Sequence, residues 1–405
     1  MLISIFFIIV IYHLFQTTIS NERKIFSFIA IFVYLIITVI DYHWLISIEN
    51  YPFHPSDPSR YYLDIHGLSL KGVLAIESSN HFYFIINWFY DQIWNNAFLV
   101  SFLIKINNVL VFISAYLLMT RKAEKFTYID ILLLFNPYAI VTLIRNVRDI
   151  YIILFVVMVI VGLDIIPNNR IKKRWFIIGG ILLSITRSVL LLIFAFIAFV
   201  KYRKRFSKTF QYSVLGVILI GCFIFFQEIM QRIASQFISA MDYMGEDIVE
   251  FLPLLSGGLN LSLFIVFIKR IIIALAVFLF TPHPVNFISD WLVNMDETGK
   301  MNIYTGLDNV LISFGAIFNY LLVIPVIISY LFHWEKSNKF VFIFVIGFII
   351  LYTVAFLGAT DIRNRNTVIF FILSGIIVQN QKLKVTKLHY LCAVFIFFSI
   401  YFISN

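Results

Sequence analysis

Apolar segments alternate with short basic segments along the whole of this sequence. Ten of the apolar segments predict helices in a lipid bilayer, because each is long enough to cross most or all of a hydrocarbon core. They cover residues 2–18, 25–41, 96–119, 127–143, 149–166, 209–226, 310–333, 340–358, 367–380 and 388–403. The pattern therefore predicts an all-α polytopic membrane protein.

The segment at 175–200 decides the predicted topology, because the basic clusters RIKKR (170–174) and KYRKRFSK (201–208) flank it. A single helix would put the clusters on opposite faces of the membrane. A short hairpin with its tip at Arg187 would put both on the cytoplasmic face, as the positive-inside rule favours. With the hairpin, six cytoplasmic loops hold 19 of the 31 lysines and arginines, whereas a single span divides them 9 against 10. We therefore predict the hairpin, about twelve membrane helices and both termini outside.

This topology leaves two large extracytoplasmic loops, at about 42–95 and 227–309. The second loop contains an apolar stretch, 261–280, with Lys269 and Arg270 at its middle. Since a span there would reverse every later loop, a re-entrant or surface-lying helix is expected. No polar segment is long enough to bury a core of its own, so 1–405 is predicted to form a single integral membrane domain.

Composition agrees with a membrane location: 61% of the residues are hydrophobic and 13% are charged. The net charge of +9 lies in short clusters between the apolar segments, which argues against nucleic acid as a partner and for membrane lipids. No histidine spacing marks a metal site, and no glycine-rich loop follows a strand. No metal and no cofactor is expected.

Arginine is enriched on the predicted outer face. Three outer turns are expected to present guanidinium groups at similar depth, from Arg145, Arg148, Arg187, Arg363 and Arg365. A charge held near the bilayer centre costs about 2.5 to 3.5 kcal/mol, so these groups need a compensating partner.

The planar fork of arginine matches a pair of phosphate oxygens better than lysine does. We therefore expect Arg145 and Arg148 to bind the diphosphate of a lipid-linked substrate, with Pro137 kinking the helix that leads to them. The alternative is that the arginines reach to lipid headgroups and pair with Asp149 or Asp361.

The first outer loop contains a second group of candidate residues in the stretch SDPSRYYLD, residues 56–64. Asp57 is the first choice for a general base that takes a proton from an attacking hydroxyl. Arg60, Tyr61 and Tyr62 are candidate substrate-binding residues, since aromatic rings stack on the apolar faces of sugars. A solvated loop with a proline turn explains the same stretch equally simply.

The order of these landmarks resembles that of the Wzy-type polysaccharide polymerases, which include the EpsG-like membrane proteins. The resemblance is carried by SDPSRYYLD, SSNHFYFIINWFYDQI, NPYAIVTLIRNVRDIYIILF, ILLSITRSVLLLIFAF and DIRNRN, in that order. It covers most of the chain through patterns rather than fixed signatures.

The resemblance implies a fold related to the GT-C glycosyltransferases in the bacterial inner membrane, with the active site facing the periplasm. The implied substrate is undecaprenyl diphosphate carrying an oligosaccharide repeat unit, as in O-antigen, and a chain-length regulator is an implied partner. The growing chain would pass from its carrier to the terminal sugar of a new unit, and the five arginines would hold the diphosphate leaving group. Two alternatives stay open: a lipid-linked oligosaccharide flippase, and an O-antigen ligase or another GT-C glycosyltransferase.

Overall fold

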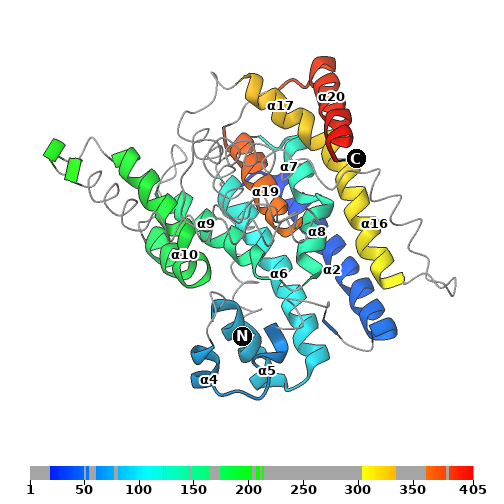
Figure 1. Ribbon diagram of the computed structural model, residues 1–405, viewed down its shortest axis with the longest axis vertical. Helices are drawn as coiled ribbons and strands as arrows, with labels where there is room; N and C mark the ends of the chain where they lie inside the picture. The colour runs from blue at the N-terminus through cyan, green and yellow to red at the C-terminus, as the bar shows by residue number, and fades with distance from the viewer. Residues whose placement is uncertain are drawn as a thin grey trace, which may run out of the picture.

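The structure is a computed structural model in which every regular element of the described residues is a helix (Figure 1). It describes residues 19–49, 52–53, 61–76, 81–121, 123, 125–145, 147–163, 174–202, 207–209, 212–213, 303–333, 362–379 and 383–404. The prediction of an all-α chain is confirmed for these residues. The predicted spans 2–18 and 340–358 and the stretch 261–280 lie outside them, as does the predicted span 209–226 except for residues 209, 212 and 213.

Three of the described helical stretches are long and apolar enough to cross a membrane: Asn21–Ser47, Ala97–Thr120 and Leu311–Phe332. They belong to α2 (Asn21–Glu49), to α6 (Ala97–Thr120) and to a continuous rod formed by α16 (Ile303–Phe318), the π-helical turn η3 (Asn319–Val323) and α17 (Ile324–Phe332). The predicted spans 149–166, 367–380 and 388–403 appear as the shorter helices α9 (Asp149–Gly162), α19 (Ile362–Val378) and α20 (Lys387–Ser404). These helices indicate a membrane protein.

The exposed and buried faces of α2 are reversed in polarity relative to those of a surface helix in a water-soluble protein. Its exposed face is apolar, and Phe28 and Phe32 are 62% and 66% exposed. Its buried face carries the polar residues Arg23, Ser27, Tyr34, Thr38 and Asp41. A surface helix in water would place these two faces the other way round. The exposed face of α2 is therefore suited to contact with lipid.

Buried ion pairs join α2 to its neighbours at both ends. The Arg23 guanidinium lies 3.0 Å from Asp130, at the start of α7 (Tyr128–Leu134), and the Lys105 ammonium of α6 lies 2.7 Å from Asp41. All four side chains are fully buried. Between the two pairs, Tyr34 donates a hydrogen bond to the carbonyl of Leu134. These contacts align α2 with α6 and α7.

The predicted helix at 127–143 is interrupted, as Pro137 indicated. Helix α7 ends at Leu134 and α8 (Pro137–Ile144) begins three residues later. The Asn136 side chain caps α8 by accepting a hydrogen bond from the Tyr138 amide at 2.9 Å. Pro137 occupies the first helical position, where its missing N–H is not needed.

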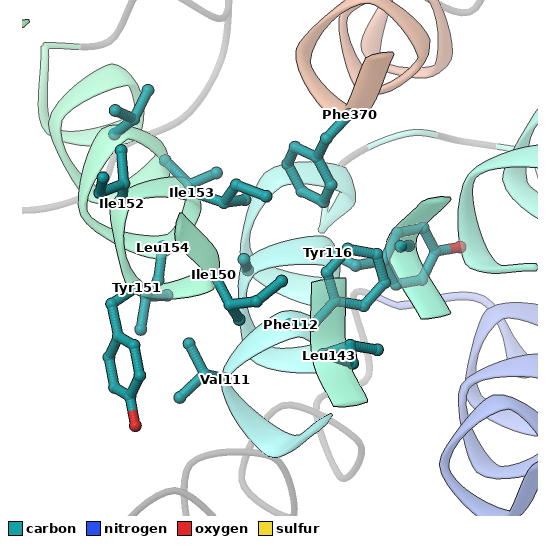
Figure 2. Packing of buried hydrophobic residues seen from close by; sticks show 14 of the residues in the cluster. Val111, Phe112, Tyr116, Leu143, Ile150, Tyr151, Ile152, Ile153, Leu154 and Phe370 are labelled. Atoms are coloured by element: carbon teal, nitrogen blue, oxygen red, sulfur yellow. The ribbon is translucent and has the colours of Figure 1, made fainter. Parts of the chain in front are cut away.

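The core lies where α6, α9 and α19 meet. Figure 2 shows Phe370 of α19 beside Phe112 of α6, with Ile150 and Ile153 of α9 turned toward them. The two phenylalanine rings meet edge to face with centroids 5.6 Å apart. Residues on α9 are buried all round, as expected of a helix at the centre of a bundle.

The prediction of a hairpin at 175–200 is wrong. One continuous helix, α10 (Arg174–Tyr202), runs through Arg187, because the sequence around that residue contains neither proline nor glycine. The glycines of this region instead allow close packing against α9. A Cβ atom at Gly179 would lie 2.8 Å from the Cβ of Met158, and one at Gly162 would lie 2.3 Å from the Phe176 amide nitrogen.

The continuous α10 places the two flanking basic clusters at opposite ends of a helix about 42 Å long, more than a hydrocarbon core requires. The bias in charge that favoured twelve helices depended on the hairpin and is lost with it.

The predicted first outer loop is largely helical. Helix α2 continues to Glu49, and α4 (Leu70–Ala75) and α5 (His81–Trp94) follow. Figure 1 shows α4 and α5 together at the N-terminal end of α6. The Trp88 indole donates to the Leu68 carbonyl at 2.8 Å, which fixes α5 to the segment before α4. Polar side chains of α5 are thereby brought to the end of the bundle.

The continuous α10 predicts that residues 174 and 207 lie on opposite faces of the membrane. Single cysteines at Arg174 and Ser207, in a chain with Cys222 and Cys392 changed to serine, test this with an impermeant maleimide applied to intact cells. One position should react and the other should react only after the cells are opened. Equal labelling of both positions from one side would restore the hairpin.

Candidate functional site

Polar residues from five segments meet near the N-terminal half of α6, at the end of the bundle covered by α5. They come from α2, α5, α6, the α8–α9 turn and α9, and we refer to them as the polar layer: Asp41, Tyr83, Lys105, Asn107, Asn108, Arg145, Arg148 and Tyr151. In a chain so rich in apolar residues, this concentration of polar groups marks the layer as a candidate site.

Lys105 is the centre of the polar layer. Besides its ion pair with Asp41, its ammonium donates to the carbonyl of Ile144, the last residue of α8. Asn108 donates to the neighbouring Leu143 carbonyl at 3.3 Å. The C-terminal end of a helix has carbonyl groups without partners and a partial negative charge. The Lys105 ammonium and the Asn108 amide donate to two of these carbonyls, and the ammonium also offsets the charge. Helix α6 thereby fixes the start of the α8–α9 turn.

The α8–α9 turn carries the two arginines for which diphosphate binding was predicted. Arg145 immediately follows α8, and Arg148 immediately precedes α9. Among the described residues, the Nη1 atom of Arg148 is buried without a hydrogen-bond partner, and no ion pair joins Arg148 to Asp149. The predicted alternative of an Arg148–Asp149 pair is therefore not present.

The side-chain oxygens of Asn107 and Asn108, in the same layer, are also buried without a hydrogen-bond partner in the described part of the chain. The amide nitrogen of Asn107 is engaged, since it donates to the Tyr151 hydroxyl. Buried polar groups are nearly always hydrogen-bonded, so each exception calls for an explanation. Of the three atoms, only Arg148 Nη1 is a donor, so Arg148 is the group that can bind an anion, whereas the two amide oxygens can only accept hydrogen bonds.

The backbone of Arg187 lies level with the α8–α9 turn, although the hairpin that suggested this depth is absent. Helices α9 and α10 are antiparallel, and Gly179 packs on Met158. Arg187 lies eight residues after Gly179, and Ile150 lies eight residues before Met158. Because the rise per residue is the same in both helices, Arg187 and Ile150 lie at the same level. The side chain of Arg187 lies outside the described part, as does that of Arg363.

Arg365 lies in a second cluster, apart from the polar layer. It is buried on α19, and its guanidinium interacts electrostatically with Tyr138 and Tyr320. Tyr138 precedes Arg145 by seven residues, or about 10 Å along a helix axis. The described contacts of Arg365 are thus with residues of α8 and η3, and its depth relative to Arg145 and Arg148 stays a prediction.

Tyr61 and Tyr62 differ from the prediction of sugar-stacking residues. Their exposed fractions are 5% and 3%, which leaves no face for a sugar ring. Tyr61 meets Tyr83 edge to face at 5.3 Å, and Tyr62 stacks on Phe53 at 4.8 Å. Both rings therefore position the segment 61–67. Asp57 and Arg60 lie outside the described residues.

A constellation that the sequence analysis did not assemble lies beside this segment. Asp91 of α5 accepts a hydrogen bond from the Tyr62 hydroxyl at 2.9 Å, and its carboxylate lies 3.0 Å from Nδ1 of His66. The signal in the sequence was a polar stripe along α5, in which Tyr83, Asn87 and Asp91 recur every four residues inside an apolar segment.

Comparison with protein-family models, with curated proteins and with solved structures gave no match. In the described part of the chain, no three His, Cys, Asp or Glu side chains are grouped so that they could hold a metal ion.

The Lys105–Asp41 pair predicts a large coupling in stability. Asp41→Ala should lower the free energy of unfolding by about 3 to 5 kcal/mol, because it leaves a buried ammonium without its counter-charge. Adding Lys105→Met to this variant should recover much of the loss. Thermal unfolding of the protein in detergent measures both effects. A double variant at least as unstable as the sum of the two single variants would show that the pair is not coupled.

Proposed function

We propose that this chain is a membrane glycosyltransferase that polymerises lipid-linked oligosaccharide repeat units, as in O-antigen or capsule synthesis. The observation that carries the proposal is the Nη1 donor of Arg148, which is buried and has no hydrogen-bond partner among the described residues. The resemblance of the sequence to Wzy-type polymerases supports the finer assignment. It also supports a GT-C-like fold and a site facing the outside of the bacterial inner membrane.

Transfer of a glycan from undecaprenyl diphosphate develops negative charge on the departing diphosphate. Donors already oriented toward that charge lower the barrier, since they need no reorganisation during the reaction. The α8–α9 turn offers two guanidinium groups close to the N-terminal end of α9, where the helix dipole also favours an anion. Arg148 would bind the diphosphate directly, and Arg145 belongs to the same turn.

Lys105 has a different part in this proposal. Its ammonium is already engaged by Asp41 and by the Ile144 carbonyl, so it positions the turn and does not bind substrate. The donor lipid would lie along the apolar helix surfaces, and the glycan would extend toward α5.

Arg148→Ala should reduce polymer by at least about 100-fold at unchanged protein level, the usual effect of removing one donor that stabilises a developing anion. Arg148→Lys should recover little, because a lysine cannot form the paired contact. The measurement is a gel of surface polysaccharide from a deletion strain complemented with each variant. Arg174→Ala, an exposed arginine at the start of α10, is the matched control and should behave as wild type.

The deletion strain itself separates the candidate functions. Single capped repeat units without longer polymer indicate a polymerase, whereas the complete loss of capped units indicates a ligase or a flippase. A wild-type ladder from Arg148→Ala would contradict the role of this arginine in any of the three.

A further inference from the structure

We propose that His66, oriented by Asp91, is the proton acceptor that activates the acceptor sugar hydroxyl. This inference rests on the proposed function and adds to it the residue that takes the proton. It is based on the hydrogen bonds between the segment 61–67 and Asp91 of α5.

The hydrogen bonds around Asp91 define the state of the imidazole. Asp91 Oδ1 lies 3.0 Å and Oδ2 3.2 Å from His66 Nδ1, and Tyr62 donates its hydroxyl hydrogen to Oδ1 at 2.9 Å. Since a carboxylate only accepts, Nδ1 carries the hydrogen of a neutral His66. The second ring nitrogen, Nε2, then keeps its lone pair and can accept a proton.

Exposure differs sharply within this group. The His66 side chain is 49% exposed, whereas that of Asp91 is 3% exposed. Asp91 is occupied by two donors inside the protein, so it can orient the imidazole but cannot reach a substrate. His66 is open to a substrate and is connected to a buried carboxylate, which is the arrangement that a general base requires.

Tyr62 fixes the other side of the pair. Its ring is stacked on Phe53, and its hydroxyl also lies 3.1 Å from His66 Nδ1. Phe53 follows Pro52, whose carbonyl accepts a hydrogen bond from Ser101 of α6. The imidazole is therefore attached through Tyr62 to the N-terminal part of α6.

Helix α6 contacts both the segment that supports the His66 group and the end of α8 that leads into the α8–α9 turn. Ser101 contacts the segment that supports Tyr62, and Lys105 contacts the end of α8 next to Arg145. The two contacts are four residues apart, or about 6 Å along the helix axis. Both groups are therefore held by the same stretch of α6, residues 101–105.

The step is balanced without a further reactant. The acceptor hydroxyl oxygen attacks the anomeric carbon of the donor and forms the new glycosidic bond. The bond between that carbon and the diphosphate oxygen breaks, and its electron pair leaves with the lipid diphosphate. The hydroxyl proton passes to Nε2 of His66 and then to solvent.

The test uses the purified full-length protein in proteoliposomes with a lipid-diphosphate-linked repeat unit. His66→Ala should lower kcat by at least about 100-fold with little change in KM, since general bases contribute about 10²- to 10⁴-fold. Added imidazole should restore part of the rate, which a purely structural role of His66 would not allow. His81→Ala, a histidine of α5 outside this group, is the matched control and should retain the wild-type rate.

The outcomes distinguish the two proposals. If the wild type does not extend the repeat unit, the proposed function fails and the base assignment with it. If the wild type extends the unit and His66→Ala retains more than half of its rate, only the base assignment is overturned. Binding of the lipid-linked unit gives a second readout: His66→Ala should bind it and Arg148→Ala should not. If His66→Ala does not fold, His66→Gln takes its place in both assays, with the same loss of kcat expected.

Discussion

The ion pair between Lys105 and Asp41 is the interaction on which the rest of this structure depends. Two charges without access to water are costly unless they meet, so the pair determines how α2 faces α6. The ammonium also binds the last carbonyl of α8 and thereby fixes the turn that carries Arg145 and Arg148. One buried cation thus connects the packing of three helices to the position of the candidate diphosphate site.

The two parts of the site differ in how they hold their charges. In the polar layer, Asp41 pairs with Lys105, and the Nη1 donor of Arg148 has no partner among the described residues. Near α5, Asp91 orients His66. A leaving group that becomes more negative needs open donors, whereas a hydroxyl that loses a proton needs an oriented acceptor. Under the proposed function, the two parts would serve the two ends of one glycosyl transfer.

Much of the helical pattern could be predicted from the sequence, because lipid-facing helices are apolar over most of their length. The span at 96–119 and the break at Pro137 are examples. The hairpin predicted at Arg187 is not present. The distribution of charge among loops favoured it, but the sequence around Arg187 has continuous helix propensity, and nearby glycines pack α10 on α9. Asp91 was missed because its partner His66 lies 25 positions away, a distance that no local pattern reveals.

The central claim is that Arg148 binds a lipid diphosphate. A cryo-EM structure of the protein with undecaprenyl diphosphate tests it most directly. The diphosphate should lie within hydrogen-bond distance of Arg148 Nη1, at the α8–α9 turn. Diphosphate density at another place, such as the Arg365 cluster beside Tyr138, with Arg148 left without a ligand, would contradict the claim.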